Sequence, residues 1–361
     1  MNTDIKPKVM QAAVLYEVNQ PLKVVDLELP ELEFGQVLVK VLFSGVCRSQ
    51  VMEARGGRGE DPWLPHLLGH EGSGIVIAVG EGVTKVAPDD EVILGWLKGD
   101  GHDAPGARYR NGGQLINSGR VTTFSNYSIV SESRVVIKPD DLPFDEAILY
   151  GCALPTGAGM ALNEMAPSVD ASVLVIGLGG IGLSALMALK ALGVKNIIAV
   201  DVSDEKLEMA KHMGSSHCLN ATDEGFVERV YEITTNGVDY CIESAGRVST
   251  IELGFSLINK NSGKLLFASH PPEGEFIQLA PHELISGKQI SGSWGGATQP
   301  DRDIPRMHDL FKTAEIPLGA LLTKRYRLEQ VNDALDDLEA GRVFRPLIVM
   351  DHVSELTANI D

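Results

Sequence analysis

Three glycines in the middle of the chain have the types and spacing of a dinucleotide-binding loop. Residues 177–182 read Gly-Leu-Gly-Gly-Ile-Gly and directly follow an apolar run at residues 173–176. In such a loop the glycines permit a tight turn, close approach of the backbone to a pyrophosphate, and close packing of the next helix on the strand. The amides at the helix N-terminus then face the phosphates. The motif alone is weak, because an ordinary strand-to-helix turn has the same form.

Asp201 strengthens the interpretation of the loop. It ends the next apolar run, about 20 residues after the last glycine, where a ribose-binding acid is expected. A carboxylate accepts hydrogen bonds from the ribose hydroxyls but repels a 2′-phosphate, and the following residues Val202–Glu205 supply no arginine. The sequence therefore favours NAD over NADP, although Asp201 could also simply cap the next helix.

Two cysteines and one histidine could together hold a metal. Cys47, His70 and Cys152 have no local zinc-finger spacing, and each alone is more often an ordinary core residue than a ligand. All three nevertheless fall at the ends of expected elements. Two thiolates and an imidazole suit a catalytic zinc, because three protein ligands leave a fourth position open. Cys218 and Cys241 are expected to be structural.

The elements that must position these residues fall into two patterns. Before residue 150, short Val- and Leu-rich runs between turn residues predict irregular, mostly antiparallel β structure, with strands at residues 9–16, 22–29, 37–43, 74–79, 91–97 and 127–138. From residue 172, apolar strands alternate with helices, which predicts a parallel sheet covered on both faces. A helix at 303–314, a helix at 328–340 and a strand at 346–350 close the chain.

Composition narrows the class of protein. The 361 residues predict two or three domains, and the formal net charge of −18 makes a nucleic-acid or membrane-surface partner improbable. We find no secretory signal and no membrane span. Four scattered cysteines do not make a disulfide framework, so we expect a reducing cytoplasm.

Six motifs occur in the order seen in zinc-dependent medium-chain alcohol dehydrogenases, and the sequence resembles that family from about residue 9 to residue 350. They are Gly-Val-Cys-Arg-Ser at 45–49, Gly-His-Glu at 69–71, Cys-Ala-Leu-Pro-Thr-Gly at 152–157, the glycine loop, Asp201, and Gly-Val-Asp-Tyr at 237–240. The resemblance implies an α/β protein. A GroES-like β-rich catalytic domain, discontinuous at residues 1–153 and 297–361, would enclose a Rossmann NAD-binding domain with a doubly wound parallel sheet at residues 154–296.

The resemblance also implies a role for individual residues. Cys47, His70 and Cys152 would hold one catalytic zinc, with Glu71 behind it as an outer or transient ligand, and Ser49 would carry the hydroxyl proton away. The cofactor would contact residues of both domains: Arg48, Thr156, Gly177, Leu178, Gly179, Gly180, Ile181, Gly182, Asp201, Lys206 and Arg345. Trp96 and Phe124 would wall the substrate pocket. Lys206 and Arg345 could instead be surface charges, and Trp96 could belong to the core.

The sequence departs from the family pattern at several positions. No cysteine lies between residues 47 and 152, so the four-cysteine structural zinc of many relatives is excluded, and we predict one zinc per subunit. Gln50 stands where the family usually has an aspartate bonded to the ligand histidine, and its lack of charge should make His70 less basic. Met52 replaces a histidine that ends the proton relay in some relatives.

The function expected from the sequence is reversible hydride transfer between NAD and a primary or secondary alcohol, or its aldehyde or ketone. The channel candidates favour an uncharged substrate, although Arg108, Arg110 and Arg120 leave an acidic one open. Two alternatives remain: a zinc-free enone or quinone reductase on the same scaffold, and a catalytically weak NAD-binding protein with a structural or regulatory purpose. We expect a homodimer or homotetramer, with the strand near residues 289–294 as a pairing edge.

Overall fold

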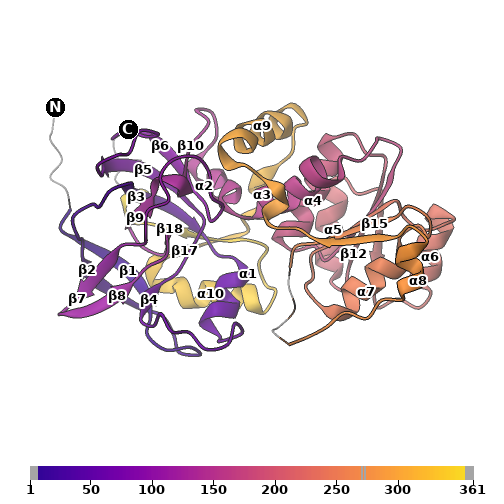
Figure 1. Ribbon diagram of the computed structural model, residues 1–361, viewed down its shortest axis with the longest axis horizontal. Coiled ribbons are helices and arrows are strands. Elements are labelled where there is room, and N and C mark those ends of the chain that lie inside the picture. Colours follow the sequence, from indigo (N-terminus) through magenta and orange to yellow (C-terminus); the bar gives the residue numbers. More distant parts are fainter. Residues whose placement is uncertain (1–6, 270, 272–273, 354–361) are drawn as a thin grey trace. The chain divides into compact units, whose positions relative to one another are not determined.

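The computed structural model of the protein describes residues 7–269, 271 and 274–353, and these form two compact units (Figure 1). The first unit comprises Met1–Cys152, Gln299–Pro305 and Leu318–Asp361, and the second comprises Ala153–Thr298 and Arg306–Pro317. The sequence assigned residues 306–317 to the first domain, whereas they cluster with the second unit. They include the larger part of the helix α9 (Pro300–Thr313).

The first unit contains a closed barrel with the strand order β1-β2-β7-β8-β4. Its strands are β1 (Val9–Leu15), β2 (Lys23–Glu28), β4 (His66–Leu67), β7 (Arg108–Asn111) and β8 (Gln114–Asn117). β1 pairs antiparallel with β2 from Val9 opposite Glu28 to Val14 opposite Lys23. Predicted strands at residues 9–16 and 22–29 are confirmed by this pair.

A seven-stranded sheet forms the rest of the β structure of this unit, in the order β10-β6-β5-β3-β18-β17 with β9 also paired to β3. Its strands are β3 (Gln36–Gly45), β5 (Gly72–Val79), β6 (Glu91–Leu94), β9 (Tyr127–Ser131), β10 (Val135–Ile137), β17 (Lys324–Arg327) and β18 (Pro346–Val349). β18 pairs antiparallel with β3, so the chain's last strand joins the sheet of its first third. The sequence missed β17, because Lys-Arg-Tyr-Arg has a single apolar residue.

Short helices connect these strands. They are α1 (Arg48–Ala54), η1 (Glu132–Arg134), α2 (Phe144–Ala147), η2 (Ile148–Gly151), η5 (Leu318–Leu321), η6 (Leu328–Gln330) and α10 (Val331–Glu339). α10 contacts α1, and its buried residues Val331, Ala334 and Leu335 have the i, i+3, i+4 spacing of one helix face. The helix predicted at 328–340 is thus confirmed, with its first turn in the 3-10 form.

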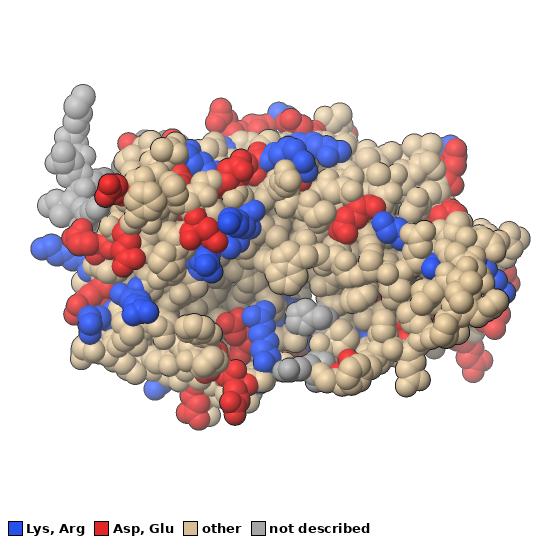
Figure 2. All heavy atoms as spheres, in the orientation of Figure 1, with Lys and Arg blue, Asp and Glu red and all other residues tan. Residues whose placement is uncertain are grey.

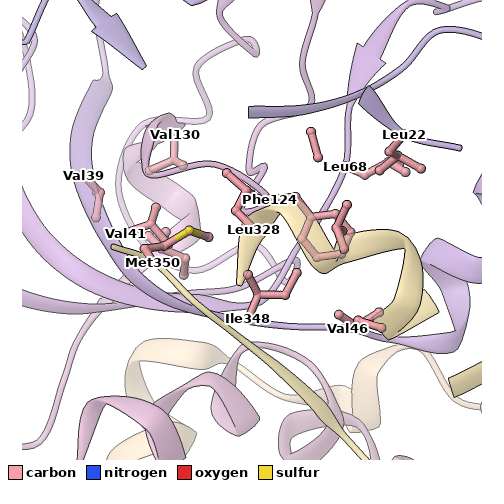
Figure 3. Close-up of a cluster of buried hydrophobic side chains, with 14 of the residues drawn as sticks. Leu22, Val39, Val41, Val46, Leu68, Phe124, Val130, Leu328, Ile348 and Met350 are labelled. Atoms are coloured by element: carbon pink, nitrogen blue, oxygen red, sulfur yellow. The ribbon is translucent and has the colours of Figure 1, made fainter. Parts of the chain in front are cut away.

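A hydrophobic core unites segments that are distant in the sequence (Figure 3). Val39 and Val41 of β3, which lie on one face of the strand because they are two residues apart, meet Ile348 of β18 and Leu328. Phe124 lies in the same cluster with 1% of its surface exposed. Burial of such side chains contributes about 1.5–3 kcal/mol each, so this core fixes the strand ends that carry the site residues described below.

The segment from residue 99 to 120 contains an ordered hairpin. β7 and β8 pair antiparallel around Gly112 and Gly113, whose φ angles of 51° and 91° are those of a tight primed hairpin turn. Before the hairpin, the Glu132 carboxylate accepts the backbone amides of Thr84, Lys85 and His102 at 2.7–2.8 Å. Burial opposes ionisation of Glu132, but these amide hydrogen bonds outweigh it and lower its pKa.

The second unit contains a six-stranded parallel sheet in the order β13-β12-β11-β14-β15-β16. Its strands are β11 (Ser172–Ile176), β12 (Asn196–Asp201), β13 (His217–Asn220), β14 (Tyr240–Glu243), β15 (Lys264–Phe267) and β16 (Gln289–Gly292). All five residues of β11 are buried, as expected for the central strand of a sheet covered on both faces. The order reverses at β11, which is the doubly wound arrangement that the sequence predicted.

The helices of the second unit are α3 (Ala153–Gly159), η3 (Met160–Met165), α4 (Gly180–Ala191), α5 (Asp204–His212), α6 (Phe226–Thr234), α7 (Val248–Leu257), α8 (Pro281–Ile285) and η4 (Gly295–Ala297). α4 follows β11 and packs on α3 and β12. Because the strands are parallel, their carboxyl ends lie at one edge of the sheet, where the loop before α4 begins.

Within the described part of the chain, no helix is long and apolar enough to cross a bilayer. On the face drawn in Figure 2, acidic and basic side chains are interspersed. The acidic side chains on this face are therefore scattered rather than gathered into one patch.

Candidate active site

Three donor atoms converge in the first unit. The Sγ of Cys47, the Sγ of Cys152 and the imidazole of His70 all lie within 4.8 Å of one another. His70 Nε2 is 3.2 Å from Cys152 Sγ, which is 3.8 Å from Cys47 Sγ. These residues are 23 to 105 positions apart in the sequence, and the fold brings them together. Two thiolates and an imidazole are donors that Zn²⁺ prefers, so the side chains fit a zinc ion.

The local structure explains why each donor points to the same place. Cys47 follows the end of β3 and is the N-cap of α1, with extended backbone angles. His70 follows Gly69, whose φ of 88° only glycine adopts readily and whose Cα faces the backbone of Phe124. Cys152 joins η2 to α3, so all three donors lie at element ends, as the sequence predicted.

The pKa values of the two cysteines are shifted in opposite directions. The Cys152 thiol donates to Cys47, and this hydrogen bond, with help from His70 and Arg345, outweighs burial and holds the pKa of Cys47 well below its usual range. The same hydrogen bond and burial raise the pKa of Cys152. One thiolate is therefore already stabilised, and the second proton is released when a metal binds.

Gln50 connects the N-cap to the ligand histidine. Its Oε1 accepts the backbone amide of Cys47 at 3.0 Å, and its Nε2 contacts His70 Nδ1. A ring that binds zinc through Nε2 carries its proton on Nδ1 and therefore needs an oxygen there. The Gln50 amide can supply that oxygen only by rotating and giving up the Cys47 contact, whereas a carboxylate could accept both hydrogen bonds.

Glu71 lies beside Arg345 instead of joining the three donors. Its Oε1 is 3.0 Å from Arg345 Nη1, and both side chains are buried, with 0% and 6% exposed. Burial raises the pKa of Glu71 to about 7, against the opposing attraction of Arg345. Arg345 also donates to the carbonyl of Val46. The structure therefore gives Arg345 a buried structural partner, which the sequence did not anticipate, and its predicted pyrophosphate contact stays a prediction.

Ser49 has a buried hydroxyl with no hydrogen-bond partner among the described residues. It lies two residues after Cys47, in the first turn of α1. A buried hydroxyl without a partner is costly, so it marks a place where another polar group is expected. Such a hydroxyl fits the predicted role of Ser49 as the acceptor of a proton from a bound alcohol.

Three of the four glycines in residues 177–182, namely Gly177, Gly179 and Gly182, each meet a different requirement in the second unit. Gly177 has a φ of 86° and lies against the backbone of Ala245. A Cβ at Gly182 would lie 1.9 Å from the Gly177 carbonyl oxygen, so only glycine lets α4 begin so close to the strand. A Cβ at Gly179 would meet nothing within 4 Å, which leaves open space beside the start of α4. That space fits a pyrophosphate.

Asp201 binds the glycine loop directly. Its Oδ2 accepts the Leu178 amide at 2.7 Å, and its Oδ1 accepts the Val202 amide at 2.8 Å. Lys206 Nζ lies 3.8 Å from Oδ2, so the predicted ribose-binding pair is adjacent. Ser203 is the N-cap of α5 but makes no side-chain cap. Asp201 thus links the ends of β11 and β12. It does more than cap the next helix, which was the alternative role considered for it.

Thr156 is buried on α3 beside the same loop. A Cβ at the neighbouring Gly157 would lie 2.0 Å from the Ile181 carbonyl oxygen, so α3 packs closely on the start of α4.

Glu243, which was not identified from the sequence, ends β14 beside β11. Its Oε1 accepts hydrogen bonds from the amides of Ala245 and Gly246 and from the hydroxyl of Thr250. Burial raises the pKa of Glu243. The sequence signal that could have identified Glu243 is a charged residue at the end of an apolar strand.

The remaining predicted residues have mixed positions. Trp96 is half-buried, and its amide donates to the Gly151 carbonyl at 3.3 Å, next to Cys152. Phe124 is a core residue of the cluster in Figure 3, and we therefore leave it out of the proposed substrate pocket. The family resemblance had placed Phe124 in the channel wall, but its ring lies in the apolar core. Arg48 is exposed at the start of α1.

These features define a dehydrogenase with a Rossmann-type nucleotide unit and a β-rich unit that carries a zinc-type donor set. A family model for the alcohol dehydrogenase GroES-like domain matches residues 33–140, and one for zinc-binding dehydrogenases matches residues 180–313. The chain belongs to the zinc-dependent medium-chain alcohol dehydrogenase family.

Relatives of known sequence and structure agree with this assignment. An S-(hydroxymethyl)glutathione dehydrogenase from Paracoccus denitrificans is 29% identical over 94% of this chain and 99% of its own. A benzyl alcohol dehydrogenase from Acinetobacter calcoaceticus has a solved structure with 29% identity and a TM-score of 0.87 over 95% of this chain and all of its own. A solved alcohol dehydrogenase zinc-binding domain protein from Burkholderia ambifaria is 27% identical, with a TM-score of 0.88 over 95% of this chain and 99% of its own.

Proposed function

We propose that this protein is an NAD-dependent zinc alcohol dehydrogenase that transfers hydride reversibly between NAD and a primary or secondary alcohol. The observation that carries the proposal is the convergence of two sulfurs and one imidazole within 4.8 Å in a member of this family. When bound, zinc supplies Lewis acidity to the alcohol oxygen, and NAD accepts the hydride. The alcohol becomes an aldehyde or ketone, NAD becomes NADH, and one proton is released.

The chain's own residues have separate tasks in this reaction. Cys47, His70 and Cys152 hold the metal, and Glu71 stays paired with Arg345. Ser49 accepts the hydroxyl proton, for which its unpartnered buried Oγ is suited. Met52 cannot take a proton further, so the proton leaves through the ribose and water.

Cofactor choice depends on Asp201. Its carboxylate ends β12 beside the glycine loop and would repel a 2′-phosphate. Lys206 is held near that carboxylate. We therefore propose NAD as the cofactor, and we expect Asp201→Asn to weaken discrimination against NADP, with Asp204→Asn, three residues further on, as the matched control.

The substrate class is an uncharged alcohol or carbonyl compound. Arg120 Nε is 3.0 Å from Asp103 Oδ1, so its charge already has a partner. Burial opposes ionisation of Asp103, but a hydrogen bond from Ser133 and nearby cations outweigh it and lower its pKa. Trp96, whose amide contacts Gly151 next to Cys152, is the remaining aromatic candidate for the pocket wall.

A substrate screen tests the proposal. Benzyl alcohol and S-(hydroxymethyl)glutathione, the compounds named for two relatives, head a panel of primary and secondary alcohols assayed by NADH absorbance. We expect NADH formation that a strong chelator removes and added zinc restores. Turnover that survives complete zinc removal would favour the zinc-free reductase, and no turnover by the zinc-loaded protein would favour a binding role.

We further propose a homo-oligomer located in the cytoplasm. β16 is an edge strand, and Ile285 and Trp294 on either side of it are about 80% exposed. A second copy of the chain would cover this edge. Light scattering distinguishes monomer, dimer and tetramer, and a monomeric mass would contradict the proposal. Cell fractionation tests the location, which we base on the four free cysteines.

A further inference from the structure

A second group of metal-ligating side chains lies in the first unit, apart from the two cysteines and His70. One ligand atom each from Glu53, Asp61 and His66 lies within 4.8 Å of the other two. We propose that these three residues bind an exchangeable divalent cation. The site is separate from the proposed catalytic function and would stand even if that function were wrong.

The surroundings of His66 indicate that a cation is needed there. Its Nδ1 is 3.0 Å from the Leu67 carbonyl oxygen, which can only accept a hydrogen bond, so Nδ1 carries a proton. Its Nε2 then presents a lone pair, yet it lies 2.8 Å from Asp61 Oδ2 and 4.0 Å from Glu53 Oε1. A lone pair facing two carboxylates is unfavourable unless a positive charge lies between them. A metal ion or a second ring proton would supply that charge.

Burial and the arrangement of the donors suit a metal ion. The side chains of His66, Asp61 and Glu53 are 8%, 14% and 25% exposed, so the group is partly shielded from water. Arg58 Nη1 binds Glu53 Oε2 at 3.0 Å and balances part of the acidic charge, while Oε1 still faces His66. A metal ion would bind one atom of each of the three residues, whereas a second ring proton could form a hydrogen bond to only one carboxylate.

The site is accessible from a cavity. Glu53 and His66 line a hollow of about 390 Å³ together with the exposed Trp63 and the segment at residues 117–122, and Gln50 and His70 line the same hollow. An ion can therefore enter without unfolding of the unit. Because Glu53 is on α1 and His66 opens β4, a bound ion would join the helix to the strand across the intervening loop.

The donor chemistry separates this site from the cysteine site. One nitrogen and two carboxylate oxygens suit Mn²⁺ as well as Zn²⁺, whereas thiolates select softer ions. Because only three donors are available and both carboxylates are partly exposed, they should hold the ion loosely. The protein would thus retain one tightly bound zinc and exchange the second ion with the buffer, which is consistent with a single tightly bound zinc per subunit.

Manganese binding to the zinc-loaded, full-length protein tests the proposal. Free Mn²⁺ is followed by electron paramagnetic resonance during titration. We expect one saturable Mn²⁺ per chain, and we expect Asp61→Asn and Glu53→Gln each to weaken binding at least about tenfold, the smallest effect typical of disturbed metal sites. Glu60→Gln, an exposed neighbour outside the group, is the matched control and should bind as the unaltered protein does. Cys47→Ser should also retain Mn²⁺.

Thermal unfolding gives a second measurement. Added Mn²⁺ should raise the melting temperature of the unaltered protein and of Glu60→Gln, but not of Asp61→Asn, because an ion that binds the folded state stabilises it. The proposal is overturned if no Mn²⁺ binds, or if Mn²⁺ binds equally to the Asp61 and Glu53 variants. It is also overturned if His66 shows protons on both ring nitrogens by NMR and added Mn²⁺ leaves its signals unchanged, since the pair would then be an ordinary ion pair.

Discussion

The two units build their sites in opposite ways. In the first unit the donors come from residues 47, 70 and 152, and Glu71 meets Arg345 from the far end of the chain. In the second unit the candidate cofactor site is almost entirely one short segment, residues 177–182, with Asp201 binding it through Leu178. One site depends on long-range packing of side chains, and the other on local backbone conformation.

This difference determines what each site can tolerate. The metal site needs particular side chains and a core that holds distant segments in register. The nucleotide loop needs the absence of side chains at particular backbone positions. Substitutions should therefore act through charge and pairing in the first unit and through steric fit in the second.

The largest effect should come from breaking the buried pair of the first unit. Arg345→Met leaves the Glu71 carboxylate buried without its partner, and we expect a loss of about 3–5 kcal/mol in the free energy of unfolding. Urea denaturation measures it. Arg325→Met is the matched control, because the Arg325–Asp145 pair is exposed and should contribute less than about 1 kcal/mol. Equal losses in both variants would show that the buried pair contributes no more to the free energy of unfolding than the exposed pair does.

Two alanine substitutions separate fit from binding in the glycine loop. Gly182→Ala places a Cβ 1.9 Å from the Gly177 oxygen and should destabilise the protein by about 1–3 kcal/mol. Gly179→Ala meets nothing within 4 Å and should leave stability unchanged, but its methyl group occupies the space offered to the pyrophosphate. We expect NADH to bind Gly179→Ala about tenfold more weakly, equivalent to ~1.4 kcal/mol. Fluorescence titration with NADH and thermal unfolding distinguish the two; unchanged NADH affinity would place the cofactor elsewhere.

A charge added at Gln50 should strengthen the metal site. In Gln50→Glu the carboxylate can accept both the Cys47 amide and the His70 Nδ1 proton, which the amide cannot do at once. Outer partners of zinc ligands commonly change affinity about 10- to 100-fold, so zinc should resist a competing chelator correspondingly longer. Gln20→Glu, an exposed glutamine outside both groups of donors, is the matched control for the added charge. Faster zinc loss from Gln50→Glu would show that the amide is the better partner.

The smallest effect should be a pH dependence in the second unit. Burial raises the pKa of Glu243 above the ordinary carboxyl value of 4.5. Between pH 4.5 and the raised pKa of the folded state, the unfolded chain has lost a proton that the folded chain keeps. The contribution of Glu243 to stability therefore falls as pH rises through this range. Gln cannot ionise, and the melting temperature of Glu243→Gln should gain on that of the unaltered protein from pH 4.5 upwards. A constant difference across this range would mean that Glu243 ionises normally.

The sequence predicted the second unit well because its signals are local. Strand β11, the loop and Asp201 follow one another within a single βαβ segment, and each requirement can be stated for a residue type at a given spacing. Glu243 was missed because its partners, the amides of the loop after β14, become visible only in three dimensions.

The first unit was less predictable because its contacts are not local. The cysteines and His70 were identified through family resemblance, and their spacing alone would have left them as ordinary residues. Arg345 next to Glu71 could not be foreseen, since β18 reaches β3 only through sheet pairing. The hairpin at residues 108–117 had a readable Asn-Gly-Gly turn, but its polar strands hid the pairing.

Zinc content and alcohol oxidation, measured on the same samples of the unaltered protein, Cys47→Ser and Cys218→Ser, test the central claim most directly. Cys218 contacts Ser215 at 3.0 Å in the second unit and takes no part in the donor set. We predict one tightly bound zinc and NADH formation in the unaltered protein and in Cys218→Ser. Cys47→Ser should lose the zinc and lower kcat/KM about a thousandfold, the scale of several kcal/mol of charge stabilisation. Undiminished turnover by zinc-free Cys47→Ser would contradict the account.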